Sequence, residues 1–260
     1  MNNTVDLNRF GMLFKKHTVE HFRFYAMSLV VLGGVMMLVF SFDAAARGNY
    51  ELSRGDQMGF FFLFLLLGGS IFASTVFSDL GEKRRAIQSL MLPASAIEKY
   101  LVGWIYTVVI YPLLCISCFY VIDCFFVFVV NGKSDAELVN VFSTNNDSHV
   151  LFGIYGLLNS LSLFGAVFFE KLHFVKTAFL FFVALAVTIF INKALLQMLI
   201  PEETRAMLPF AQVGLGKRGM AYAEILLPFG VQEIYVSVVL ISTMLLFWLA
   251  AYFRLREKQI

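Results

Sequence analysis

The chain has 260 residues, of which 59% are hydrophobic and 30 are Phe, with a mean hydropathy of +0.77 and a formal net charge of +2. A soluble domain of this length could not hide that much apolar surface in its interior, so lipid must be its solvent. We therefore expect membrane lipid as a partner, and we expect no nucleic acid.

Six stretches of the chain run for about the width of a bilayer with almost no charge, and a helix needs ~20 apolar residues to cross ~30 Å of hydrocarbon. Helices are expected rather than barrel strands, because the runs lack an alternating pattern and unpaired backbone groups are costly in lipid. The sequence predicts an all-α polytopic membrane protein with a single transmembrane domain over residues 1–260. Its expected spans cover residues 24–42, 57–78, 100–122, 148–169, 177–200 and 234–253.

The charges between these spans sort by side. Lys and Arg number 13 in the N-terminal arm, the 79–99 loop, the 170–176 loop and the tail, against 7 acidic residues there. The other three loops hold 6 basic and 10 acidic residues. The positive-inside rule then places both termini in the cytoplasm. The first apolar run begins after Arg23 and is long enough to stay as a helix, so we expect no cleaved signal.

Residues 5–24, ahead of the first span, have the pattern of a helix that lies flat on the membrane surface. A loose basic tail is the alternative. The apolar positions on one side are Leu7, Phe10, Leu13 and Phe14, and the cationic positions are Arg9, Lys15, Lys16 and Arg23. His17 and His21 lie one helical turn apart, but no third ligand is near, so we do not expect a metal site there.

The second cytoplasmic loop, residues 79–99, is too long for a tight turn and too apolar for a simple tether. Apolar positions at helical spacing follow a basic triplet, and Pro93 ends the short helix that they predict. Ser95 stands three residues before Glu98, which predicts a capping box at the start of the third span. A helix held crosswise under the membrane would offer charges and apolar anchors to a cytoplasmic partner. An amphipathic turn that only sits in the headgroups is the alternative.

The last outer loop, residues 201–233, carries two apolar pieces, 206–213 and 220–229, which are too short to span and are broken by Gly and Pro. They predict two short helices that dip into the outer leaflet as a re-entrant hairpin, with a loose loop as the alternative. The glycine-containing stretch 214–219 lacks the spacing of a phosphate loop, so we expect no nucleotide site there.

The order of these parts is similar to that of the membrane subunit of type-2 ABC exporters, and the resemblance covers nearly the whole chain. The most particular stretch is Arg85-Ala-Ile-Gln-Ser-Leu-Met-Leu-Pro-Ala-Ser-Ala-Ile-Glu-Lys-Tyr100, which resembles the corresponding loop of many bacterial permeases. The resemblance implies a multi-pass protein of the bacterial inner membrane.

In that family two permease subunits pair, as a homodimer or a heterodimer, and each presents a cytoplasmic coupling helix to a separate ABC ATPase subunit. The chain has no Walker A sequence, so ATP and magnesium would bind to that partner, and we expect no catalytic residue or cofactor here. A non-transporting membrane scaffold or sensor is the alternative function. The resemblance places the coupling helix at residues 83–95. Its expected ATPase contacts are Lys83, Arg84, Arg85, Ile87, Leu90, Met91, Pro93 and Ser95.

Asp123 and Lys193 are the ionizable residues inside the expected spans, and such residues often face protein or mark a pathway. We hypothesise an Asp123–Lys193 pair toward the outer ends of these helices. Clustered acids and histidines are missing from the spans, so we do not expect an intramembrane enzyme. The cysteines, which all fall in the third span without metal-binding companions, are expected to fill the core. They are Cys115, Cys118 and Cys124.

Overall fold

The computed structural model describes residues 6–47, 54–77, 94–130, 140–142, 148–169, 172–199, 204–205, 213–215, 223–225 and 231–258. In that part of the chain, six helices are long and apolar enough to cross a membrane, as the sequence predicts. This is the helix content of a multi-pass membrane protein. The chain forms two compact units, Met1–Phe174 with Met244–Ile260, and Val175–Thr243. The single transmembrane domain stays a prediction.

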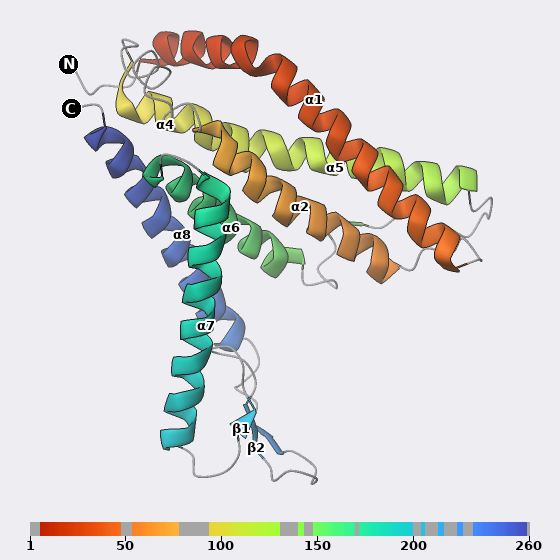
Figure 1. The fold of residues 1–260 in the computed structure, drawn as a ribbon, viewed down its shortest axis with the longest axis vertical. Coiled ribbons are helices and arrows are strands. Elements are labelled where there is room, and N and C mark those ends of the chain that lie inside the picture. The colour runs from red at the N-terminus through yellow and green to blue at the C-terminus, as the bar shows by residue number, and fades with distance from the viewer. Residues whose placement is uncertain are drawn as a thin grey trace. The chain divides into compact units, whose positions relative to one another are not determined.

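The helices follow the expected spans closely (Figure 1). In the first unit, α1 (Leu7–Arg47), α2 (Arg54–Val76) and α6 (Ser148–Phe168) are each one helix. The third span is made of four segments in succession, α4 (Ala96–Ile105), the π-helix η2 (Tyr106–Ile110), α5 (Tyr111–Cys124) and the π-helix η3 (Phe125–Val130). Most of α7 (His173–Leu199) lies in the second unit, and α8 (Val231–Glu257) begins there and ends in the first.

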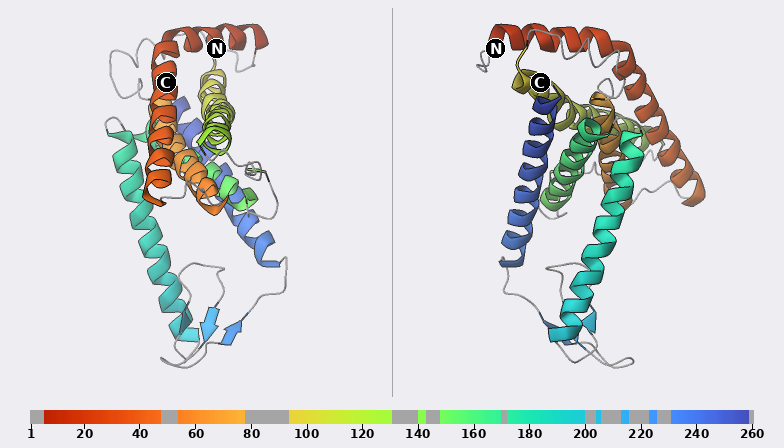
Figure 2. Two further views of the ribbon diagram at one scale, coloured as in Figure 1. Left: turned by 90° about the vertical axis from the view of Figure 1, so that its right-hand side faces the viewer. Right: turned by 60° about the vertical axis from the view of Figure 1, so that its left-hand side comes forward.

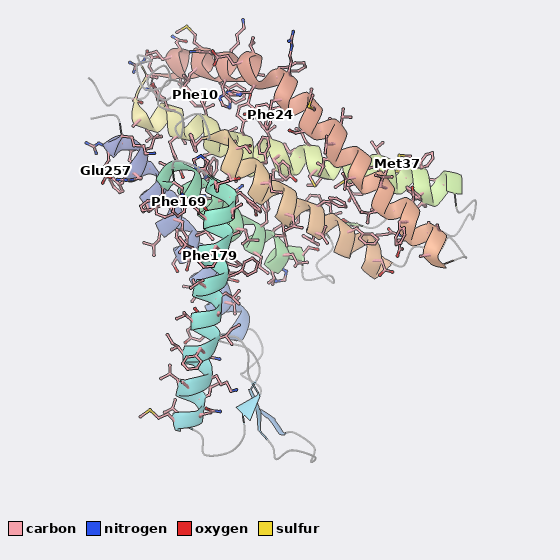
Figure 3. The ribbon with its side chains drawn as sticks, viewed as in Figure 1. Phe10, Phe24, Met37, Phe169, Phe179 and Glu257 are labelled. Atoms are coloured by element: carbon pink, nitrogen blue, oxygen red, sulfur yellow. The ribbon has the colours of Figure 1, made fainter. Side chains whose placement is uncertain are left out.

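The expected surface arm and the first span form one continuous helix, α1. Figure 2 shows this helix bend into two arms, and Phe24 lies at the bend (Figure 3). The hydroxyl of Ser28 donates a hydrogen bond to the carbonyl oxygen of Phe24 at 2.9 Å. A hydroxyl that competes for a helical carbonyl in this way often bends a helix. The predicted boundary at residue 24 therefore coincides with a change of direction.

Two buried apolar clusters hold the first unit together, and α2 contributes to both. A multi-pass bundle needs such close packing because lipid tails are as apolar as its own side chains. The first cluster includes Met36 and Phe40 of α1, Phe61 and Leu65 of α2, and Phe119 of α5. The second includes Ala73 of α2, Phe77 directly after α2, Tyr100 of α4, Leu163 of α6 and Leu255 of α8.

The other side of the spanning part of α1 stays exposed although it is apolar. Val30 is 72% and Phe42 is 77% exposed, whereas Met36 and Phe40 are fully buried. Exposed apolar side chains on a bundle of this kind are expected to contact lipid. The helix is thus apolar on the side that packs against protein and on the side that does not.

The segment between α7 and α8 departs from the expected helices. Its described parts form a three-stranded antiparallel sheet in the order β1-β2-β3, in which residue 204 pairs with 215 and residue 214 with 224. The strands are β1 (Thr204–Arg205), β2 (Val213–Leu215) and β3 (Ala223–Ile225). The helical prediction is therefore wrong at residues 213 and 223–225. Helices this short are marginal on their own, and Gly lowers their stability further. The rest of the predicted hairpin lies outside the described residues.

Candidate functional site

The third span begins at a capping box. Ser95 is the N-cap of α4, and its hydroxyl oxygen accepts a hydrogen bond from the backbone N–H of Glu98 at 3.3 Å. The Glu98 carboxylate accepts in return from the backbone N–H of Ser95 at 2.8 Å. The predicted capping box is therefore confirmed, and it fixes the point at which the preceding loop becomes helix.

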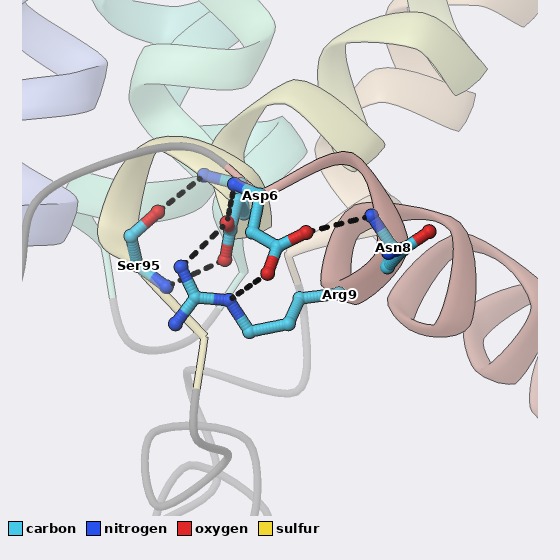
Figure 4. A network of polar contacts seen from close by, with 5 residues as sticks. Asp6, Asn8, Arg9 and Ser95 are labelled. Carbon is cyan, nitrogen blue, oxygen red and sulfur yellow. Dashed lines mark hydrogen bonds and ion pairs between the residues drawn. The ribbon is translucent and has the colours of Figure 1, made fainter.

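The same carboxylate also holds the N-terminal arm (Figure 4). Oε1 of Glu98 accepts from the backbone N–H of Asp6 at 2.9 Å and from Nη2 of Arg9 at 3.4 Å. The Asp6 carboxylate caps α1 by accepting from the N–H of Asn8 at 2.9 Å, and it lies 3.7 Å from Nε of Arg9. We call Asp6, Arg9, Ser95 and Glu98 the Glu98 clamp. It joins segments that are 89 residues apart along the chain.

The Glu98 side chain is fully buried, so the clamp must replace the water that a carboxylate would otherwise bind. A buried charge costs several kcal/mol unless an opposite charge and hydrogen-bond donors compensate it. Here both carboxylate oxygens have donors, and Arg9 supplies the opposite charge. With both its oxygens engaged, Glu98 is suited to joining the N-terminal arm to the start of the third span rather than to exchanging a proton with a substrate.

A second joint connects the arm to the third span at Tyr106, the first residue of η2. The Tyr106 ring stacks on Phe14 with 5.2 Å between centroids, and its hydroxyl shares a hydrogen bond with that of Thr18. The His17 ring meets Tyr106 edge-on at 4.9 Å, and its Nε2 lies 2.7 Å from the Tyr25 hydroxyl. The arm is therefore attached to the third span at two levels, the clamp and Tyr106.

These contacts correct the predicted faces of the arm. Phe10 and Phe14, placed by the sequence pattern on the membrane side, are half-buried, and Phe14 packs against protein. Arg9, placed among the cations of the surface, binds Glu98 instead. Protein and lipid are both apolar neighbours, so the helical period alone could not tell which of them this face contacts.

The π-helix η2 leaves one backbone carbonyl of the third span without a helical donor. The N–H of Tyr111 bonds to the carbonyl of Tyr106, five residues back, instead of to Thr107. The next residue, Pro112, has no N–H to offer. In a membrane an unpaired carbonyl costs several kcal/mol, so the Thr107 oxygen needs a donor from elsewhere.

Polar side chains of α6 supply that donor. The Tyr155 hydroxyl donates to the Thr107 carbonyl at 2.6 Å, and Nδ2 of Asn159 lies 3.3 Å from the same oxygen and 3.3 Å from the Tyr155 hydroxyl. The Tyr111 hydroxyl donates to the carbonyl of Phe64 in α2 at 3.0 Å. We call Thr107, Tyr111, Tyr155 and Asn159 the π-helix node. It ties the third span to α2 and α6 by hydrogen bonds at the irregular turn.

Sequence reasoning found the capping box but missed the rest of the Glu98 clamp, the contacts of Tyr106 and the π-helix node. No local pattern could connect Arg9 to Glu98. Pro112, inside an otherwise helical run, was an available signal of irregular backbone. Tyr155 and Asn159 lie four residues apart, so they share one face of an apolar span, which was a second signal.

The predicted ATPase-contact residues fall mostly beyond what the structure describes. Ser95 takes part in the Glu98 clamp. The others lie outside the described residues, so those contacts stay predictions. They are Lys83, Arg84, Arg85, Ile87, Leu90, Met91 and Pro93.

The ionizable residues of the spans lie in different units. Asp123 is fully buried in α5, in the first unit, whereas Lys193 is exposed on α7, in the second. Their pairing stays a prediction. Cys115 is buried in the first apolar cluster, and Cys118 and Cys124 are half-buried. Among the described residues, no three His, Cys, Asp or Glu side chains gather as a metal site.

Comparison with known proteins adds no relative. No family model, no curated protein and no solved structure matches the chain. The six candidate spans, the Glu98 clamp and the π-helix node are therefore the observations from which a function is inferred.

Proposed function

We propose that this chain is the permease subunit of an ATP-driven ABC transporter, an exporter that pairs with a second permease and works with a separate ATPase. The observation that carries the proposal is the Glu98 clamp. The loop expected to receive the ATPase, residues 79–99, ends in this clamp. Ser95 and Glu98 fix the last turn of the loop, and Arg9 ties that turn to the N-terminal arm.

The clamp connects such a loop to two spans, the first and the third. Ser95 is followed directly by the third span, and Glu98 holds an arm that continues through α1 into the first span. A displacement of the loop would therefore reach the first and third spans together. Alternating access requires a movement of this kind, in which several spans change position between two stable arrangements.

In this proposal the chain contributes the substrate path and the loop that transmits movement, and its partner contributes ATP hydrolysis. The paired permeases would form the substrate path, while ATP and magnesium would bind to the ATPase subunits. Arg84 would offer that subunit a charge-assisted hydrogen bond, and Leu90 would offer it an apolar anchor. Both termini and the loop would lie on the cytoplasmic side, consistent with the distribution of Lys and Arg.

The test is recovery of the partner from the native membrane. The tagged full-length chain is purified in mild detergent, and the proteins that remain bound are quantified by mass spectrometry. The loop variant is Arg84→Glu with Leu90→Asp. A matched control, Leu7→Asp with Arg256→Glu, makes the same two chemical changes at exposed positions outside the loop, near the two ends of the chain.

We expect an ABC ATPase to be recovered with the wild type and with the control, and to be lost from the loop variant. Recovery of a different cytoplasmic partner without any ATPase would contradict the transporter. That result would favour the alternative function, a non-transporting scaffold or sensor that uses the same loop. If an ATPase binds the loop variant as well as it binds the wild type, the coupling helix does not lie at residues 83–95.

A further inference from the structure

The N-terminal arm carries an exposed stripe on the side that takes no part in the two joints. Positions 12, 15, 16, 19, 22 and 23 are spaced by three, four and seven residues, so they lie on one side of a helix. The apolar members are 64% to 69% exposed, and the cationic members are exposed as well. We call these residues the outer stripe: Met12, Lys15, Lys16, Val19, Phe22 and Arg23.

The outer stripe faces away from the third span. The half-buried positions of the arm, including Phe14, Thr18 and Tyr25, are those that contact Tyr106. Figure 3 shows nitrogen-tipped and sulfur-tipped side chains projecting from the arm on the side away from α4. One side of the arm is thus docked on protein, and the other presents apolar and cationic groups.

The stripe keeps a net positive charge. Lys16 lies 3.6 Å from Glu20 of the next turn, but both side chains are exposed, and such pairs are weak in water. Within the described residues, neither Lys15 nor Arg23 forms an ion pair. Two cations of the stripe are therefore available to an anionic partner, and the third is held only by an exposed neighbour.

We propose that the outer stripe binds the headgroups of anionic lipids on the cytoplasmic side of the membrane. The arm is the direct continuation of a candidate span, so the stripe is held where that span meets the membrane surface. Met12, Val19 and Phe22 would enter the boundary between headgroups and acyl chains. The long side chains of the three cations would lie along that boundary, with their charged ends at the lipid phosphates. This inference does not depend on the proposed transport function.

A lipid fits this surface better than a soluble protein does. A stable protein interface covers about 800 Å² on each partner, more than one face of a short helix offers. An anionic bilayer needs no shape complementarity, and each Lys or Arg near such a surface strengthens binding about fivefold. The stripe offers apolar side chains to the acyl chains and cations to the phosphates from one side of the helix.

The test measures lipid binding by the purified full-length chain. Native mass spectrometry follows the retention of added phosphatidylglycerol and, separately, of phosphatidylcholine. The arm variant changes Lys15, Lys16 and Arg23 to Gln. A charge-matched control changes Arg254, Arg256 and Lys258 to Gln, which removes three cations from the same side of the membrane at the other end of the chain.

We expect the wild type to prefer phosphatidylglycerol, the arm variant to lose that preference by tenfold or more, and the control to stay within about twofold of the wild type. A second variant, Val19→Ser with Phe22→Ser, should weaken the binding of both lipids and leave their ratio unchanged. Because the changed positions of the arm are all exposed, thermal unfolding of the two arm variants should match that of the wild type.

Three results would overturn the inference. Equal binding of the two lipids by the wild type would show that the chain does not select anionic headgroups. An arm variant that keeps the wild-type preference for phosphatidylglycerol would show that other residues of the chain select the headgroup. Competition by inorganic phosphate at the same concentration as the lipid would assign the cations to a soluble anion rather than to a membrane.

Discussion

The Tyr155 hydroxyl lies 2.6 Å from the carbonyl oxygen of Thr107, to which it donates a hydrogen bond. This side chain takes the place of a backbone donor, because the N–H of Tyr111 donates to the carbonyl oxygen of Tyr106 and Pro112 has no N–H. A residue of α6 thereby completes the backbone of the third span. The irregular turn and its partner helix are consequently coupled, and the coupling can be measured.

The Tyr155→Phe change should destabilise the protein by about 1 kcal/mol, since a typical buried hydrogen bond contributes about that much. The loss is expected to be partial, because Asn159 also donates to the Thr107 carbonyl. Unfolding in mixed micelles measures it. The control is Tyr252→Phe, which keeps its ring contact with Tyr100, 6.1 Å between centroids, and should cost less than about 0.5 kcal/mol. Equal losses in the two variants would mean that the Thr107 bond contributes nothing.

The Pro112→Ala change should make Tyr155 less important. An alanine at position 112 has an N–H that can donate within the turn, so the Thr107 carbonyl no longer depends on α6 alone. In this background Tyr155→Phe should therefore cost clearly less than in the wild type. A double-mutant cycle of the four proteins measures the difference. Additive effects would show that the proline and the tyrosine do not act on the same carbonyl.

Two glycines of α2 should respond oppositely to alanine. A Cβ at Gly69 would overlap the Tyr155 ring, whereas a Cβ at Gly59 would meet nothing within 4 Å. Gly69→Ala should destabilise by about 1–3 kcal/mol through overpacking. Gly59→Ala should be neutral or stabilising by up to about 1 kcal/mol, because alanine is the better helix former. Thermal unfolding in detergent compares them, and a harmless Gly69→Ala would contradict the close approach of α2 and α6.

The Glu98→Gln change should loosen the N-terminal arm. It removes the charge that Arg9 compensates and weakens the hydrogen bond from the Asp6 N–H. We expect the free energy of unfolding to fall by about 1–3 kcal/mol. Hydrogen exchange should quicken in residues 6–24. The control, Glu257→Gln, breaks an exposed ion pair with Arg254 at 2.7 Å and should cost less than about 1 kcal/mol. Unchanged exchange in the arm would mean that Glu98 does not hold it.

If the chain is a permease, Glu98→Gln should separate binding from coupling. The loop surface that would contact the ATPase is untouched by this change, so the ATPase should still be recovered in the pull-down. Its hydrolysis in the reconstituted complex should respond less to the permease, because the joint between loop and arm is weakened. Loss of the ATPase itself from the pull-down would mean that Glu98 contributes to the ATPase contact and not only to the joint between loop and arm.

Local chemistry made several features predictable from the sequence. A span is recognised by about 20 consecutive apolar residues, which is a property of one segment, and all six candidate spans were found in this way. The capping box joins Ser95 to Glu98 within one helical turn, so its spacing could be read directly. The boundary at residue 24 could also be predicted locally, because the charged residues end and the apolar run begins there. Phe24 lies at the bend of the helix.

Only the tertiary structure decided which partners meet across the chain. Arg9 and Glu98 are 89 residues apart, and Tyr155 and Thr107 are 48 apart, so no periodicity links either pair. The tertiary structure also decided that Phe14 faces Tyr106 and not lipid. Helical period and hydropathy show that a face is apolar, but in a membrane both the solvent and the protein interior are apolar. Which of the two a given face contacts depends on the packing of the whole bundle.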